Sequence, residues 1–477
     1  MIRELVGHSA TYTLANLISR GTVLVWLIVL PRFMSSADYG ALGLILTTAA
    51  LFNLVPLEIG QALGRYYPAA DGDEKGNWAS TAWIFTLSTL TLVAMIALIF
   101  SQWLNRQLLG DDSYGPAFRI ALAYFVLNSS FLFAQNLFRW AFRSRDYALA
   151  TTASALVTLF LSIGLAAILS NALTGVLAGL VAGAVIGLSL AIARLGPVLR
   201  NRIDLPKLGR MLRFSLPLVP ASLALLLSTY ASRFILNDLL TLKDVGMFTW
   251  ASQLAAVPAL LLLGVQGAVT PLVIKHHAAT DTPVVLARSF ETIFSGALGL
   301  CIALGLYTPE LVRLLGYSQF AGAAPLVMLL APAMLLLQLY VFAPGFAVAE
   351  RTGLQLFVSA LGAVAAILFN YMFINAVGLI GAAIATLGSS LVFTGSWFLL
   401  SNRLYPIPAH WLRLGLLVAG AAACATVGTL AVPNGIPQAI LFKALLLAVL
   451  AALAAYLGFA RIWRLKQLIA QGPRLSE

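Results

Sequence analysis

The polar residues best suited to bind a ligand lie at a helical spacing inside an apolar run. In HSATYTLANLISRGTVLVWLIVLPRF, Tyr12, Asn16 and Arg20 recur every four residues, which places them on one slowly winding face of a helix. A guanidinium is costly in hydrocarbon, and an intramembrane arginine is expected to face a bundle interior or a water-filled cavity. The pattern therefore predicts a hydrated, positively charged cavity. In the alternative, the Arg20 side chain extends to the cytoplasmic headgroups.

A second polar face lies further along the chain. Asn128, Gln135 and Arg139 share one face of the helix predicted over 117–138, and Arg143 continues it at the cytoplasmic end. As an alternative to lining the cavity, these residues have ordinary structural roles. Asn128 and Gln135 would then form hydrogen bonds between helices, and the arginines would anchor a helix end in the headgroups.

A third polar face comes from the second half of the sequence. Thr229, Arg233 and Asn237 recur every four residues near the external end of the helix predicted over 214–237. Arg233 either lines the cavity or extends outward to the external headgroups. With Arg20 and Arg139, it would make a cationic vestibule.

Only two acidic residues fall within predicted spans. Glu58 shares a helix face with Gln61 and Arg65. It either pairs with Arg65 or acts as a coupling carboxylate that takes up an ion. Glu291 lies one helical turn from Arg288, which predicts a local ion pair.

The composition of the chain shows what kind of protein contains these polar faces. The chain has 477 residues, of which 61% are hydrophobic and 10% are charged, and its mean hydropathy is +0.94. No soluble domain approaches such values. Apolar runs of about 20 residues predict about fourteen transmembrane helices and an all-α fold. The predicted spans are 12–33, 40–62, 79–100, 117–138, 147–169, 172–194, 214–237, 245–271, 287–307, 323–345, 354–375, 378–400, 411–431 and 438–460.

The distribution of basic residues predicts the orientation of these spans. With the N-terminus inside, most of the 29 Lys and Arg residues fall on cytoplasmic segments. This is the positive-inside pattern, so both termini are expected in the cytoplasm and the charge of +12 indicates topology, not nucleic-acid binding. The external segments carry Arg32, Arg106, Lys243 and Arg313, and the spans themselves contain Arg20, Arg119, Arg233 and Lys443.

The chain also resembles itself at an offset of about 206 residues, with 35–55 aligned on 241–261. Six spans per copy is an even number, so the copies insert the same way up, related by a pseudo-two-fold axis along the membrane normal. The expected domains are an N-terminal lobe over 1–198, a C-terminal lobe over 199–403, and an extra helix pair with a tail over 404–477.

Nothing in the sequence points to catalysis. Cys301 and Cys424 each lie in an apolar run, and no nucleotide-binding loop, metal-ligand spacing or nucleophile set is apparent. We therefore predict neither an enzyme, nor a metal, nor a cofactor. The short external segments disfavour a membrane glycosyltransferase or glycan ligase, which would need a larger external region to hold an acceptor.

Three stretches resemble a known family. They are LISRGTVLVWLIVLPRFMSSADYGALGLI, RFSLPLVPASLALLLSTYASRFIL followed by DVGMFTWASQLA, and GLIGAAIATLGSSLVF. They are similar to the oligosaccharide (Wzx-type) flippases of the multidrug/oligosaccharidyl-lipid/polysaccharide exporter superfamily. The resemblance implies movement of a polyprenyl-diphosphate-linked oligosaccharide from the cytoplasmic to the periplasmic leaflet of the bacterial inner membrane, by alternating access, for surface polysaccharide synthesis.

This resemblance implies roles for the polar residues. Arg20, Arg139 and Arg233 would bind the diphosphate or charged sugars, because a guanidinium donates two hydrogen bonds at once to phosphate. Glu58 would couple transport to H+ or Na+. The residues expected to contact sugar hydroxyls are Tyr12, Asn16, Asn128 and Gln135. Membrane lipid and polysaccharide polymerase machinery are the other expected partners. A flippase for the peptidoglycan precursor and an ion-coupled multidrug exporter are the alternatives within the superfamily.

Overall fold

The chain forms a bundle of membrane-length helices. The structure, a computed structural model, describes residues 2–199, 203–260, 262, 273, 279, 281–349, 351–431 and 436–459. Twelve helices in these residues are long and apolar enough to cross a membrane, and the pair Leu205–Leu218 and Ser222–Leu239, bent by 47°, makes a thirteenth if it is one span. The prediction of an all-α, multi-pass membrane protein is confirmed. The span expected over 245–271 lies partly outside the described residues, so the count of fourteen stays a prediction.

The helices group into two compact units. The first contains Met1–Leu226 and Thr241–Gly246, and the second contains Leu227–Leu240 and Met247–Glu477. The lobe boundaries expected after residues 198 and 403 stay a prediction. The first unit holds α1 (Ile2–Val29), α2 (Ser36–Phe52), α3 (Leu54–Tyr66), α4 (Asp73–Ile99), α5 (Ser101–Leu109), α6 (Gly115–Trp140), α7 (Ser144–Ile168), α8 (Ala172–Leu195) and α9 (Leu205–Ser215).

The described part of the second unit also consists of helices and short connections. The division between the units falls within α10 (Val219–Leu239) and α11 (Leu242–Ala255). The remaining helices are α13 (Thr282–Leu315), α14 (Ala324–Leu336), α15 (Gly345–Val348), α16 (Thr352–Val377), α17 (Leu379–Leu404), α18 (Trp411–Leu430) and α19 (Ile436–Tyr456).

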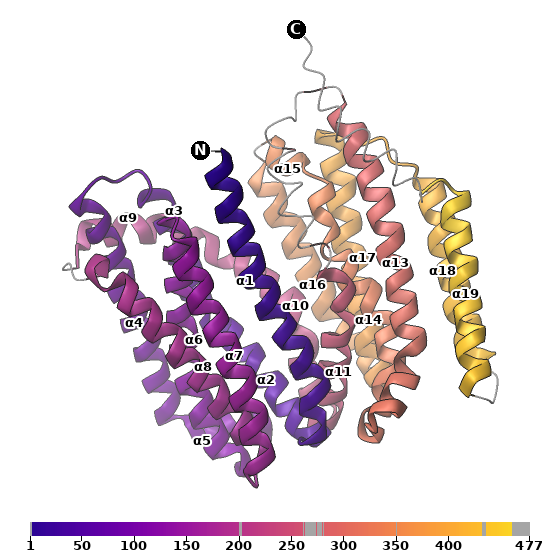
Figure 1. Ribbon diagram of the computed structural model, residues 1–477, viewed down its shortest axis with the longest axis horizontal. Coiled ribbons are helices and arrows are strands. Elements are labelled where there is room, and N and C mark those ends of the chain that lie inside the picture. Colours follow the sequence, from indigo (N-terminus) through magenta and orange to yellow (C-terminus); the bar gives the residue numbers. More distant parts are fainter. Residues whose placement is uncertain are drawn as a thin grey trace. The chain divides into compact units, whose positions relative to one another are not determined.

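In the first unit, α6, α7 and α8 pack side by side, and α1 packs along α7 (Figure 1). Bulky apolar side chains such as Phe133, Leu137 and Phe138 of α6 fill the core between these helices. The contact of α1 with α7 determines which side chains can meet the polar face of α1.

The span Ser36–Tyr66 is broken at Asn53, where α2 ends and α3 begins. Pro56 accounts for the break, because its ring has no N–H to donate to the carbonyl of Phe52 and would clash with it in a continuous helix. The Asn53 side chain uses its oxygen to accept a hydrogen bond of 2.7 Å from Ser129 of α6. The break therefore fixes the start of α3, which carries Glu58.

Helices α2 and α11 begin with the same cap, at the offset of the predicted repeat. Ser35 Oγ accepts from Asp38 N at 3.1 Å, and Thr241 Oγ1 accepts from Asp244 N at 3.3 Å. In return, the Asp38 carboxylate accepts from Ser35 N at 3.3 Å, and the Asp244 carboxylate accepts from Thr241 N at 3.2 Å. These are reciprocal capping boxes. The two aligned segments therefore share local structure as well as sequence.

The repeat-related glycines of these two helices contact each other. A Cβ at Gly40 would overlap the carbonyl oxygen of Leu242, and a Cβ at Gly246 would overlap that of Ser36. The first turns of α2 and α11, both within the first unit, therefore cross backbone to backbone. Only glycine permits this approach.

The ion pair predicted for Glu291 is wrong. Its Oε1 accepts from the backbone N of His410 at 2.6 Å and lies 2.9 Å from His410 Nδ1, while Arg288 makes no ion pair with it. His410 precedes α18, and Trp411 packs on Phe290 with ring centroids 6.1 Å apart. A tertiary partner has replaced the local one, because packing of α18 on α13 brings His410 to the buried carboxylate.

Helices α18 and α19, which correspond to the predicted spans 411–431 and 438–460, also pack on α13 and on each other (Figure 1). Lys443 of α19 is 3% exposed. Its Nζ donates to the carbonyl oxygen of Leu306 at 2.7 Å and to Glu310 Oε1. This buried ion pair, satisfied by an extra hydrogen bond, explains how α19 keeps a lysine within its apolar sequence.

The glycine crossing gives the first prediction. We expect Gly40→Ala or Gly246→Ala to lower the free energy of unfolding by about 1–3 kcal/mol, because the new methyl group forces two backbones apart. Gly164→Ala in α7 is the control, since a Cβ there meets nothing within 4 Å. The control should be neutral or slightly stabilising. Denaturation of the purified protein in detergent measures the difference, and equal stability of all three variants would contradict the crossing.

Candidate functional site

Side chains of α1, α6 and α7 meet at one buried hydroxyl. Tyr147 of α7 is 1% exposed, and its hydroxyl donates to Asn16 Oδ1 at 2.9 Å while accepting from Arg139 Nη2 at 2.8 Å. The ring of Tyr12 packs edge-on against the Tyr147 ring, with centroids 5.0 Å apart. The structure thus brings together three predicted site residues. We call Tyr12, Asn16, Arg139 and Tyr147 the Tyr147 cluster.

The tight turn between α6 and α7 positions Arg139 beside Tyr147. Phe142 takes the left-handed conformation with φ 54°, and Arg143 N donates to the carbonyl of Phe138 at 2.9 Å. The Arg143 side chain holds the turn, because its Nε donates to Asp146 at 2.8 Å and its Nη1 to the carbonyl of Arg194 at 2.8 Å. Arg143 therefore has a structural role, and only Arg139 of this pair belongs to the cluster.

Arg139 is oriented and still has donors to offer. Its guanidinium lies 5.0 Å from the centroid of the Tyr147 ring, a cation–π distance. Of its five N–H donors, one is used in a hydrogen bond among the described residues. The side chain is exposed. An oriented guanidinium with free donors can bind a phosphate or carboxylate through two parallel hydrogen bonds.

One turn from Arg139, Gln135 connects α6 to α7. Its Nε2 donates to Thr151 Oγ1 at 2.9 Å, and Thr151 is 6% exposed. This contact is the interhelical hydrogen bond foreseen as the alternative role. Asn128, two turns further along α6, is half-buried, and its side chain forms no hydrogen bond with the residues that the structure describes.

Arg20 lies one turn beyond Asn16 on α1. Its side chain is exposed and makes no hydrogen bond or ion pair within the described part of the chain. All of its donors are therefore available to a ligand. At a rise of 1.5 Å per residue, the Arg20 backbone lies about 6 Å along the helix axis from that of Asn16.

Arg233 belongs to the second unit. Its guanidinium lies 5.4 Å from the ring centroid of Tyr230 and 5.9 Å from that of Phe248. The neighbouring Ser232 contacts Thr386 of α17, with 3.2 Å between the two hydroxyls. Aromatic rings and a neighbouring helix contact hold this part of α10. Convergence of Arg233 with Arg20 and Arg139 stays a prediction.

Glu58 is buried, and it does not pair with Arg65, the cation that lies on the same helix face. It is 2% exposed, and its carboxylate accepts hydrogen bonds from Ser222 Oγ and, at 3.1 Å, from Gln61 Nε2. The alternative in which Glu58 pairs with Arg65 is wrong, because the Arg65 guanidinium instead lies 5.1 Å from the ring centroid of Phe214. Two neutral donors therefore hold a carboxyl group inside the first unit.

The residues that organise the site, above all Tyr147 and Thr151, are not among those predicted from the sequence. A signal was present, because Arg143, Tyr147 and Thr151 recur every four residues at the start of the predicted span 147–169. Ser222 offered no such signal, since its contact with Glu58 joins residues 164 apart. No group of three or more His, Cys, Asp or Glu among the described residues could hold a metal ion.

A family model described as polysaccharide biosynthesis protein matches residues 5–277 of this chain. The matched segment includes most of α1 and all of α6 and α7, so it contains the whole Tyr147 cluster. No curated protein matches the chain.

Solved membrane transporters share the fold. An inward-facing multidrug resistance MATE family transporter of the MOP superfamily is 17% identical, with a TM-score of 0.64, over 82% of this chain and 94% of that one. The lipid II flippase MurJ in an inward closed conformation is 13% identical, with a TM-score of 0.69, over 92% and 98%. A MATE transporter of Vibrio cholerae is 13% identical, with a TM-score of 0.61, over 84% and 96%. At these identities the likeness shows the fold alone.

The cluster predicts the effect of removing one oxygen atom. Tyr147→Phe keeps the ring and its contact with Tyr12 but removes the bridge between Asn16 and Arg139. We expect the free energy of unfolding to fall by about 1 kcal/mol. Tyr456→Phe is the control, because Tyr456 is 88% exposed. Denaturation in detergent compares the two variants, and equal stability would show that the bridge contributes nothing.

Proposed function

Because this chain belongs to the polysaccharide biosynthesis protein family, we propose that it is a flippase for a polyprenyl-diphosphate-linked oligosaccharide repeat unit. It moves this unit from the cytoplasmic to the periplasmic leaflet of the bacterial inner membrane, for synthesis of O-antigen, capsule or exopolysaccharide. The observation that carries the proposal is the Tyr147 cluster, which holds Arg139 in a fixed orientation with most of its donors unused.

The substrate's headgroup explains why such a cluster is useful. A diphosphate and a sugar chain cannot cross hydrocarbon, so the transporter must replace their hydration by polar side chains. Arg139 offers the paired donors that phosphate oxygens accept, and Arg20 offers a second, unneutralised guanidinium on the same face of α1 as Asn16. The polyprenyl tail stays in the lipid throughout.

Polar groups near the cluster would bind the sugars. The Asn16 amide nitrogen remains free to donate once its oxygen has accepted from Tyr147, and Gln135 Oε1 remains free to accept. Tyr12 adds an aromatic hydroxyl one turn from Asn16, and Asn128 adds an amide two turns from Gln135. Such neutral donors and acceptors suit hydroxyl groups, whereas the arginines suit phosphate.

We assign ion coupling to Glu58. A carboxyl group that is buried and hydrogen-bonded by Ser222 and Gln61, with no ion pair to a cation that the structure describes, is disposed to take up H+ or Na+. In alternating access, either ion can drive transport if the inward-open and outward-open states expose Glu58 to different sides of the membrane. An exporter of cationic drugs would also use a carboxylate, but the Tyr147 cluster is cationic and favours an anionic substrate.

The arginines give a test of function. In a strain lacking the gene, we expect Arg20→Ala and Arg139→Gln to abolish rescue of the surface polysaccharide, because each removes a phosphate-binding guanidinium. Lipid-linked glycan should then accumulate on the cytoplasmic leaflet. Arg145→Gln is the matched control, since Arg145 is exposed near the same end of α6 and has no partner among the described side chains.

Immunoblots of the membrane fraction must show equal amounts of all three variants. Normal surface glycan in either site variant would remove that arginine from the site. Glycan accumulating on the external leaflet would indicate a ligase or polymerase defect. A changed sensitivity to toxic cations, with normal glycan, would indicate a drug exporter.

The proposed orientation is testable because Cys301 and Cys424 are both buried. We expect a membrane-impermeant maleimide to label Ser113→Cys in intact cells. It should label Gly209→Cys, where a side chain meets open space, only after the membrane has been permeabilised. The opposite pattern would place the termini outside and contradict the direction of transport.

A further inference from the structure

A polar pocket lies where α5 meets the start of α6, in a region to which nothing above assigns a role. The cavity has a volume of about 230 Å³. This is smaller than the pockets that enclose drug-sized ligands and suits a single sugar ring. Its lining residues are Ser101, Gln102, Asn105, Arg106, Asp112, Gly115, Pro116 and Arg119.

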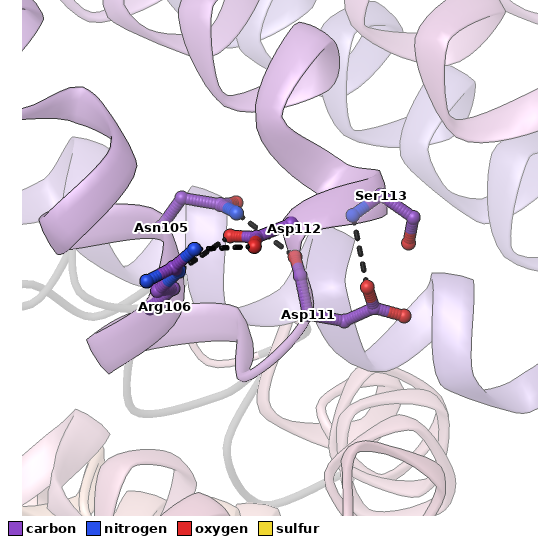
Figure 2. Close-up of polar contacts among 5 residues, drawn as sticks. All are labelled: Asn105, Arg106, Asp111, Asp112 and Ser113. Atoms are coloured by element: carbon purple, nitrogen blue, oxygen red, sulfur yellow. Dashed lines mark hydrogen bonds and ion pairs between the residues drawn. The ribbon is translucent and has the colours of Figure 1, made fainter.

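Side-chain contacts build one wall of this pocket. Arg106 donates from Nε and Nη2 to the two carboxylate oxygens of Asp112, both at 2.7 Å, as Figure 2 shows. Asn105 Nδ2 donates to the carbonyl oxygen of Asp111 at 2.8 Å, and the Asp111 carboxylate accepts from Ser113 N at 2.9 Å (Figure 2). These contacts connect the end of α5 to the segment that leads into α6, beside the pocket.

A buried acceptor in the pocket has no partner. Asn105 is 1% exposed, and its Oδ1 accepts no hydrogen bond from the residues that the structure describes. A buried polar atom left unsatisfied is destabilising, so a donor that reaches Asn105 Oδ1 when the pocket is occupied would stabilise the folded chain. The hydroxyl group of a sugar is such a donor.

Other lining groups also have unused hydrogen-bonding capacity. Ser101, Gln102 and Arg119 make no side-chain hydrogen bond or ion pair with the described part of the chain. They offer a hydroxyl, an amide and a guanidinium. Since the charges of Arg106 and Asp112 cancel in their ion pair, Arg119 leaves the pocket with one positive charge.

We propose that this pocket binds an acidic sugar, a hexuronate or a sugar with an equivalent carboxylate, of the translocated glycan. Arg119 pairs with the carboxylate, while Asn105, Gln102 and Ser101 bind hydroxyl groups. This inference rests on the proposed function, and in the proposed orientation the pocket lies on the external side, where the glycan arrives. It also explains why the chain carries Arg119 at the end of an apolar span.

The test is a binding measurement on the full-length protein, purified in detergent. D-glucuronate should bind at least about 10-fold more tightly than D-glucose, because Arg119 contributes a charge-assisted hydrogen bond only to the acid. Arg119→Gln should lower the affinity for glucuronate about 10-fold, to the level of glucose. Arg313→Gln, which removes an exposed arginine of the second unit, should leave both affinities unchanged. Isothermal titration calorimetry or saturation-transfer NMR gives these values.

Equal binding of glucose and glucuronate, or an unchanged affinity in Arg119→Gln, would overturn the proposal. Displacement of glucuronate by phosphatidylglycerol, in the wild type but not in Arg119→Gln, would make the pocket a lipid headgroup site and overturn it as well. The binding of glucuronate is measured without transport, so the pocket and the flippase are tested separately. A protein that transports lipid-linked glycan but fails to bind glucuronate would refute the pocket alone, whereas glucuronate binding without transport would refute the flippase alone.

Discussion

A polar atom inside a membrane must find a partner within the protein, because hydrocarbon supplies none. The hydroxyl of Tyr147 meets this requirement twice, by accepting from Arg139 and donating to Asn16. In doing so it fixes α1 against α6 and α7 and aims a guanidinium at the same time. The apolar packing of these helices brings the three side chains to one place, and the hydrogen bonds then determine how they point.

The same requirement separates structural charges from functional ones. Lys443 finds its partner Glu310 on another helix, whereas Arg143 pairs locally with Asp146 and reaches α8 through the carbonyl of Arg194. Among the side chains that the structure describes, Arg20 finds no hydrogen-bond partner and Arg139 finds one, which leaves the donors that a phosphate-binding group needs before its ligand arrives. Glu58 is the intermediate case, since it is buried and hydrogen-bonded but has no counter-charge within the described residues.

The two aligned segments of the predicted internal repeat share local structure as well as sequence. The same capping box starts α2 and α11, and the glycines at equivalent positions press their backbones together. A reciprocal contact of this kind is what a two-fold relation between similar segments produces, because each segment then presents the same surface to the other. The glycines therefore allow the close approach of these two aligned segments.

The sequence by itself determined the class of the protein, most of its spans, the polar faces of α1 and α6, and the alignment of Gly40 with Gly246. Those properties depend on local composition and on helical periodicity, which one segment contains in full. Only the tertiary structure decided that Glu291 meets His410 instead of Arg288, that Glu58 meets Ser222 instead of Arg65, and that Tyr147 joins three helices. Partners distant in the sequence become neighbours through helix packing, and helical periodicity fixes which way a side chain faces but not what it will face.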